Sequence, residues 1–282
     1  MSAERYPPLA RHEVEALGIR TNYYTAGSEQ GEAIVLLHGM SASADSFREL
    51  MHELEEGYRL VAPDIPGFGY SENMAPYTFE HLIEWLAAFM ARLDLRPAHL
   101  LGHSFGGALA VSFALAYPGD VSSLILLAPS VLRPGKVPQW LRGLAQSRLS
   151  EKVLEAGVLA SRLMLQRQMR AAFYEPERFD ESLWQRRAAD YGNARASAAV
   201  LRASALHDIR GDLAQLKQPS CVIWGKNDPV LDPADAKVLD ELMPRSTTTL
   251  HLLDECGHIA QIEQRGQVVQ IIGDFLGTGE QS

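Results

Sequence analysis

A serine, an aspartate and a histidine occur along this chain in an order and a setting that could form a nucleophilic site. The pentapeptide Gly-His-Ser-Phe-Gly at 102–106 places Ser104 directly after the apolar run 98–101 and before a longer apolar stretch. A strand that turns sharply into a helix holds a serine hydroxyl exposed, and flanking glycines keep Cβ atoms out of the crowded turn. The helix adds the positive end of its dipole. We therefore predict that Ser104 is a nucleophile.

A serine hydroxyl is a weak nucleophile, so it needs a base, and the base needs a carboxylate to orient it. His258 follows the apolar run 248–253 and is therefore predicted at the carboxyl end of a strand, where open α/β sheets keep their sites. Asp228 follows another apolar run in the same way. We predict His258 as the base and Asp228 as its orienting carboxylate, with Asp232 and Asp254 as alternatives to Asp228.

An acyl-transfer site also needs donors for the oxyanion that forms in the transition state. His-Gly-Met at 38–40 follows the apolar run 33–37, and its loop can aim a backbone N–H at the serine. We predict the N–H groups of Met40 and Phe105 as the oxyanion hole, where each hydrogen bond contributes roughly 3 kcal/mol.

Other residues that could do chemistry favour simpler interpretations. His103 adjoins the nucleophile on the turn and is expected to pack, and its spacing from His99 lacks the intervening Glu of a zinc motif. The Gly-Phe-Gly at 67–69 lacks the third glycine of a dinucleotide site. Cys221 and Cys256 are expected to be reduced thiols. No His, Cys and carboxylate cluster has ligand spacing, so we predict no metal and no cofactor.

Short apolar runs alternate with helical patterns along most of the chain, which predicts a parallel sheet with right-handed crossovers. The strands are expected at 33–37, 59–62, 98–101, 124–128, 220–224 and 248–253. Helices are expected from the apolar spacing that begins at Phe47 and at Phe79, and over 106–117, 233–243 and 259–276. An antiparallel hairpin is expected at 11–17 and 19–25. The fold class is α/β.

One long segment interrupts this alternation. Residues 132–210 contain helix-forming sequence and no convincing strand, which predicts a helical lid at 131–210 inserted in a core domain made of 1–130 and 211–282. The lid carries 14 Lys and Arg against 8 Asp and Glu, a net charge of +6, and leaves −15 on the rest of the chain. This basic surplus either docks the lid on an acidic core or attracts anionic groups of a substrate.

Composition restricts the classes of function. The chain has 282 residues, 46% hydrophobic and 22% charged, which is ordinary for a globular protein. A net charge of −9 argues against a nucleic-acid partner, because phosphate binding needs clustered Lys and Arg. No apolar stretch approaches the ~18 residues of a membrane span, and the first residues lack the apolar region of a signal peptide. A cytoplasmic location is the expectation.

With the serine turn and the two loops in place, the chain resembles the α/β-hydrolase superfamily over about residues 11–276. The resemblance implies the α/β-hydrolase fold, with the catalytic and amide-donor residues named above. The loop at 61–71 is also similar to a loop of that superfamily. Within it, the stretches 117–124, 223–232 and 256–258 resemble monoacylglycerol lipases and related esterases.

A second resemblance is to carbon–carbon bond hydrolases of aromatic degradation. They share a helical lid, an Arg near the place of Arg186 or Arg187, and the Gly-His-x-Ala-Gln pattern at 257–261. His103 and Phe105 depart from the Asn and Met of their serine turn, and they usually place Trp where this chain has Ile259. The haloalkane dehalogenases and epoxide hydrolases are excluded, because they use an Asp nucleophile.

The sequence therefore predicts an ester hydrolase that works through an acyl-enzyme. Its reaction partners are expected to be water and a small-molecule ester, with a medium-chain acyl group or a glycerol alcohol. The alternative is a carbon–carbon hydrolase of vinylogous diketone acids. A hypothesis from another class is a ligand receptor with little turnover, which the intact serine, aspartate and histidine set disfavours.

Overall fold

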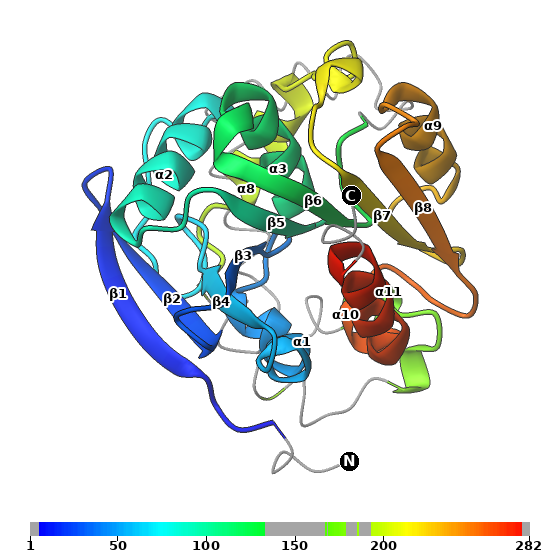
Figure 1. The fold of residues 1–282 in the computed structure, drawn as a ribbon, viewed down its shortest axis with the longest axis horizontal. Helices are drawn as coiled ribbons and strands as arrows, with labels where there is room; N and C mark the ends of the chain where they lie inside the picture. The colour runs from blue at the N-terminus through cyan, green and yellow to red at the C-terminus, as the bar shows by residue number, and fades with distance from the viewer. Residues whose placement is uncertain (1–5, 133–166, 168, 179–184, 186–192, 278–282) are drawn as a thin grey trace.

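A mostly parallel sheet of eight strands forms the centre of the molecule (Figure 1), in the order β1-β2-β4-β3-β5-β6-β7-β8. The computed structural model describes residues 6–132, 167, 169–178, 185 and 193–277. Strand β2 is antiparallel to both of its neighbours, and the other pairs are parallel. The strands are β1 (Ala10–Ala16), β2 (Ile19–Gly27), β3 (Glu32–Leu37), β4 (Tyr58–Pro63), β5 (Ala98–His103), β6 (Val121–Leu127), β7 (Ser220–Gly225) and β8 (Thr248–Leu253).

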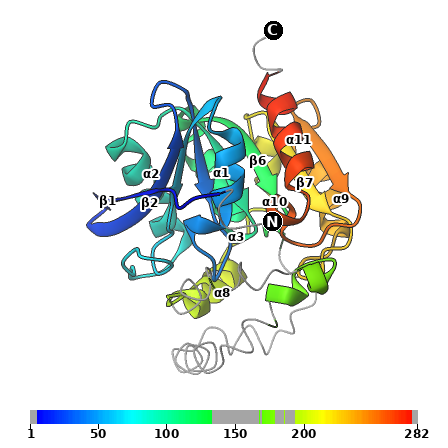
Figure 2. The same cartoon turned by 90° about the horizontal axis from the view of Figure 1, so that it is seen from below.

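Helices cover both faces of this sheet (Figures 1 and 2), which confirms the predicted fold class. Helices α2 (Phe79–Arg92), α3 (Phe105–Ala116) and α9 (Ala234–Leu242) share one cluster of buried residues. Helices α1 (Arg48–Leu54) and α11 (Arg265–Gly277) share the other. The remaining described helices are α8 (Ser197–Leu206), α10 (Ala260–Glu263) and the 3₁₀ turns Ala44–Phe47, Pro118–Asp120, Pro176–Arg178 and Leu213–Gln215.

The two cores follow from side-chain alternation in strands that are covered on both faces. In β3, Ile34 and Leu36 belong to the cluster with α1 and α11, whereas Val35 and Leu37 belong to the cluster with α2 and α3. Successive side chains of a strand point to opposite faces, so a wholly apolar run is required when both faces are buried. This is the pattern from which the central strands were predicted.

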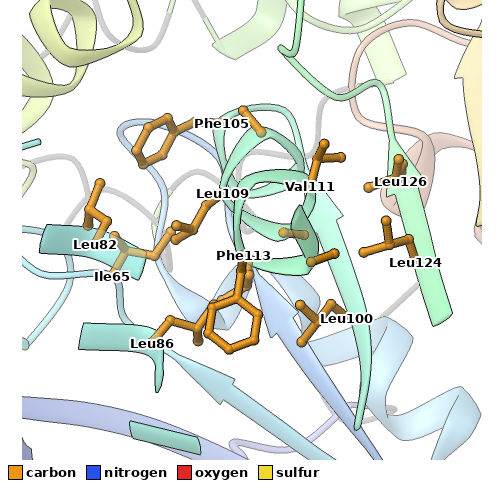
Figure 3. Packing of buried hydrophobic residues seen from close by; sticks show 14 of the residues in the cluster. Ile65, Leu82, Leu86, Leu100, Phe105, Leu109, Val111, Phe113, Leu124 and Leu126 are labelled. Atoms are coloured by element: carbon orange, nitrogen blue, oxygen red, sulfur yellow. The ribbon is translucent and has the colours of Figure 1, made fainter. Parts of the chain in front are cut away.

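Helix α3 lies deep in the larger core and supports the serine turn. Every residue from Phe105 to Ala114 is buried, as expected for a helix that is apolar on all sides. Figure 3 shows Leu109 and Phe113 of this helix between side chains of α2 and of the sheet. Burying a side chain of this size stabilises the fold by roughly 1.5–3 kcal/mol. The first residue of α3 is therefore held rigidly at the end of β5.

The C-terminal helix differs from its prediction. A single helix was expected at 259–276, but the structure has two, because Gln264 leaves helical geometry with φ −124° and ψ 39°. The short α10 stays beside the loop before it, where the Glu263 carboxylate accepts backbone N–H groups, while α11 packs on α1. The apolar spacing runs through the break, so periodicity alone did not reveal it.

Only part of the segment predicted as a lid is described. The described residues between 131 and 210 contain α8, a 3₁₀ turn and helical residues at 167, 169–171 and 185, and no strand. Arg186 and Arg187 lie outside them. The lid and its boundaries therefore stay a prediction. No helix in the described part of the chain is long and apolar enough to cross a membrane. Cys221 and Cys256 are buried free thiols, as predicted.

Candidate active site

Ser104 occupies a strained turn between β5 and α3. Its backbone has φ 52° and ψ −115°, a conformation that L-residues rarely adopt. Its N–H donates to the carbonyl of Leu127 at 2.9 Å, and its own carbonyl accepts from Ser130 at 2.9 Å. A Cβ at Gly106 would lie 2.0 Å from the carbonyl oxygen of Leu37, so only glycine fits there. The neighbouring strands thus hold the turn in place, and Ser104 stays partly exposed.

His258 and Asp228 meet in the fold although 30 positions separate them. Nδ1 of His258 lies 2.7 Å from Oδ2 of Asp228. An ionised carboxylate only accepts hydrogen bonds, so Nδ1 carries the proton and donates. The lone pair therefore lies on Nε2, which is the arrangement a general base requires.

The Asp228 carboxylate is held by several donors. Oδ1 accepts the N–H groups of Val230 and Leu231 at 2.8 and 2.9 Å, and Nε1 of Trp224 donates to Oδ2 at 3.0 Å. Burial opposes ionisation of this carboxyl, but the hydrogen bond and charge of His258, with the two N–H donors, outweigh it and hold the pKa of Asp228 below its usual value. Asp228 is therefore ionised at neutral pH. Sequence reasoning missed Trp224, whose only signal was its place at the end of the strand.

The two alternative carboxylates serve other contacts. Asp254 is exposed and pairs with Lys226 at 2.7 Å. Asp232 accepts the N–H of Ala234 at the start of α9 at 3.0 Å. Of the three candidate carboxylates, the hydrogen bond to the His258 ring is made by Asp228.

His38 pins the loop predicted to supply the oxyanion donor. The N–H of Ile65 donates to Nε2 of His38 at 3.0 Å, so the proton is on Nδ1, which donates to the carbonyl of Gly39 at 2.8 Å. Burial lowers the pKa of His38 to about 4, against the opposing hydrogen bond to Gly39. The ring is neutral and fixes the residue before Met40. Phe105 begins α3, where the first N–H groups have no partner within the helix.

The loop after β4, which donates to His38, is itself held in place by a buried carboxylate. Asp64 is fully buried and accepts hydrogen bonds from the Asn22 side chain at 2.7 Å and from the N–H groups of Ala44 and Tyr70 at 2.8 and 2.9 Å. Burial raises its pKa to about 6, although these hydrogen bonds lower it. Asp64 therefore fixes the turn cluster expected in this loop, next to the Ile65 N–H that binds His38.

His103 packs, as expected, and also makes a hydrogen bond that the sequence did not indicate. Its ring is buried 4.9 Å from that of His258, centroid to centroid. Its Nε2 lies 3.0 Å from the carbonyl oxygen of His258 and must donate. Burial first, and then the neighbouring His258, lower the pKa of His103 to about 3. His103 is thus a neutral donor that ties the serine turn to the histidine loop.

Taken together, the carboxyl ends of β3, β5, β7 and β8 bring four predicted features to one edge of the sheet. They are a strained serine, a histidine whose Nε2 is unprotonated, a buried carboxylate, and the loop at 38–40 that is predicted to supply a backbone N–H. Such a set is suited to nucleophilic attack on a carbonyl.

Comparison with known proteins places the chain in a family. Residues 32–264 match the model of the family described as alpha/beta hydrolase fold. The chain belongs to this family. It is therefore an enzyme, a hydrolase, and the fold resemblance stated from the sequence is confirmed.

Its relatives act on different bonds. The chain is 28% identical to 2-hydroxymuconate semialdehyde hydrolase of Pseudomonas sp. (strain CF600), an alignment that covers 99% of this chain and 98% of that one. It is 27% identical to monoacylglycerol lipase ABHD6 of Homo sapiens, over 87% of this chain and 75% of that one. The crystal structure of Cfl2 from Burkholderia cenocepacia is similar with a TM-score of 0.81 and 26% identity, over 96% of this chain and 97% of that one. Esterase-like and carbon–carbon hydrolase relatives thus both occur.

Proposed function

We propose that this hydrolase cleaves carboxylic esters, with a medium-chain acyl group or a glycerol ester as substrate, through an acyl-enzyme on Ser104. The observation that carries the proposal is the 2.7 Å contact of His258 Nδ1 with the buried Asp228 carboxylate. It leaves Nε2 of His258 as an unprotonated base on the same sheet edge as the strained Ser104 turn. Asp228, His258 and Ser104 then act as one unit.

The proposed reaction has two stages. As Ser104 Oγ attacks the ester carbonyl, its proton passes to Nε2 of His258, and the N–H groups of Met40 and Phe105 donate to the developing oxyanion. The imidazolium then gives its proton to the departing alcohol, which leaves the acyl group on Ser104. In the second stage His258 takes a proton from water, the hydroxide attacks the acyl carbon, and the proton returns to Ser104 Oγ as the acid leaves.

Asp228 stabilises the imidazolium that forms in both stages. Its side chain is wholly buried, so water does not screen its charge, and its second oxygen is held by two backbone N–H groups. A fixed negative charge beside the ring favours the protonated histidine of the transition state without any rearrangement at that moment. No other reactant than the ester and water is needed.

The serine turn favours an ester over a carbon–carbon substrate. His103 and Phe105 both depart from the turn of the carbon–carbon hydrolases, and Ile259 departs from the Trp that they usually carry. The structure gives two of these residues defined places. His103 donates to the His258 carbonyl at 3.0 Å, and the Phe105 ring packs edge-on against Phe79 at 5.6 Å. We infer an ester substrate from these departures from the carbon–carbon hydrolase pattern.

The second candidate function is cleavage of a carbon–carbon bond in a vinylogous diketone acid. It is favoured by the near-complete alignment with 2-hydroxymuconate semialdehyde hydrolase. In that case the basic surplus of residues 131–210 would bind the substrate carboxylate through Arg186 or Arg187, which lie outside the described residues.

One set of substrates separates the candidates. We expect p-nitrophenyl esters of two to twelve carbons to be hydrolysed with a burst of p-nitrophenol, and a vinylogous 1,5-diketone acid to be cleaved more slowly than the best ester. A faster diketone reaction that is lost in Arg186→Gln or Arg187→Gln would establish the second function. The absence of any burst with activated esters would instead support the ligand receptor.

A further inference from the structure

One carboxylate outside the proposed triad of Ser104, His258 and Asp228 accepts hydrogen bonds from backbone N–H groups on both sides of His258. Oε2 of Glu263, the last residue of α10, accepts the N–H of Gly257 at 3.1 Å and that of Tyr174 at 2.7 Å. Its Oε1 accepts the N–H of Ile259 at 3.2 Å. A carboxylate has two oxygens and about four lone-pair sites, so three donors are within its capacity.

These donors lie on two segments that are far apart in sequence. Gly257 and Ile259 flank His258, and Tyr174 belongs to the segment predicted as a lid. The N–H of His258 itself donates to the carbonyl of Ala172 at 2.8 Å. A Cβ at Gly257 would lie 2.6 Å from both the Ala172 oxygen and the Tyr174 nitrogen. The two backbones are therefore in direct contact, and Glu263 bridges them.

We propose that Glu263 is a positioning residue that sets the place of the His258 ring by joining the histidine loop to the segment 172–174. The inference rests on the proposed role of His258 as the base. In this arrangement the segment 172–174 is a fixed part of the active site, because the base is held between its own loop and the inserted chain. Hydrogen bonds to an ionised acceptor are stronger than neutral ones, which suits a carboxylate to this place.

The consequence is a specific pattern of kinetics. Asp228 fixes the rotation of the His258 ring, but the ring moves with its backbone, and this backbone is held by Glu263, Ala172 and His103. A displacement of about 1 Å in a catalytic group can cost about 100-fold in rate. Loss of the Glu263 carboxylate should therefore lower kcat for short and long acyl esters alike, because the chemistry of the ester carbonyl is common to both.

The experiment compares three variants of the full chain. Glu263→Ala removes both acceptor oxygens, and with them all three hydrogen bonds. It should lower kcat about 10- to 100-fold for both p-nitrophenyl acetate and p-nitrophenyl octanoate, with little change in KM. Glu263→Gln keeps one carbonyl oxygen and should recover part of that loss. Glu255→Gln is the control, because Glu255 lies in the same loop with an exposed side chain. Its kcat should equal that of the wild type. All rates are taken well below the melting temperature of each variant.

Amide exchange, and a comparison of melting temperature with kcat, separate a positioning role of Glu263 from a purely structural one. Amide exchange at Gly257, Ile259 and Tyr174 should become faster in Glu263→Gln, while the core strands keep their protection. A Glu263→Ala or Glu263→Gln protein that melts earlier but keeps the wild-type kcat would overturn the inference. So would a rise in KM for octanoate alone. Neither result touches the proposed function, which is tested separately by the loss of ester turnover in Ser104→Ala and by the comparison of ester with diketone substrates.

Discussion

Two sets of serine, histidine and carboxylate lie at opposite ends of the same sheet. At the carboxyl ends of the strands are Ser104, His258 and Asp228. At the amino ends, Nδ1 of His99 lies 2.7 Å from Oγ of Ser123, and its Nε2 lies 3.3 Å from the Glu32 carboxylate. The second set has the same three kinds of side chain, and its histidine contacts both of the others, so residue type alone does not distinguish the two.

The surroundings distinguish them. Ser123 lies within β6, pairs in register with His99 of β5 and is only 4% exposed, so a substrate carbonyl has no approach to it. Glu32, the partner of His99, is exposed on 72% of its side chain, where water screens the charge. Ser104, by contrast, lies on a strained turn after the strand, and the Asp228 side chain is fully buried. The two sets therefore differ in whether the serine can be approached and in whether the carboxylate is shielded from water.

The largest expected effect compares the two serines. Ser104→Ala should lower kcat for p-nitrophenyl butyrate by a factor on the order of 10⁴ or more, because members of a triad act as a unit. Ser123→Ala removes the matching hydroxyl at the other end of the sheet and should leave kcat within about twofold. Both variants should keep the wild-type circular dichroism. A Ser104→Ala enzyme with more than about a tenth of the wild-type rate would refute the assignment.

The next largest effect compares the carboxylates of the two sets, Asp228 and Glu32. Asp228→Asn should lower kcat by about 100- to 10,000-fold, because the amide no longer fixes the tautomer of His258. Glu32→Gln should leave kcat unchanged. Asp254→Asn serves as a second control, since that carboxylate pairs with Lys226 in solvent. If Asp254→Asn were the more damaging substitution in steady-state assays, the orienting carboxylate would have to be reassigned.

The smallest effect concerns the stability of the fold against acid. The pKa of His103 is about 3 in the folded protein and near 6.5 when unfolded, so between these values the unfolded chain binds more protons and stability falls as pH falls. Between pH 5.5 and 4.5, His103 should contribute about 1 kcal/mol per pH unit to this loss. Asp64, whose raised pKa acts in the opposite direction, contributes equally to all variants compared.

Urea unfolding of His103→Asn across that pH range should therefore show a shallower dependence than the wild type. His99→Asn should reduce the pH dependence of the unfolding free energy by less than His103→Asn does. Burial lowers the pKa of His99 too, but the hydrogen bond and charge of Glu32 oppose that shift. An equal pH dependence in the wild type and His103→Asn would show that His103 is not held neutral by its surroundings.

Much of this fold followed from local sequence patterns. The strand at 248–253 agrees with β8 at both ends, and the other strands and the hairpin agree within a few residues. Apolar runs that must be buried on both faces leave little choice of element. The break at Gln264 was missed, because it depends on Glu263 bonding to a loop outside the helix.

The sequence by itself determined the order of serine, aspartate and histidine, their places after strands, and the glycines that allow the serine turn. These are local properties, since a strand end and a crowded turn depend on neighbouring residues. Only the tertiary structure decided which carboxylate meets His258, that Trp224, His103 and Glu263 hold the site, and that Ser123 and His99 form a second, inaccessible set. Most of these contacts join strands and loops far apart in the chain, and the local ones, such as Trp224 to Asp228, depend on how a loop folds back after its strand. Packing fixes these distances, and a linear pattern does not encode them.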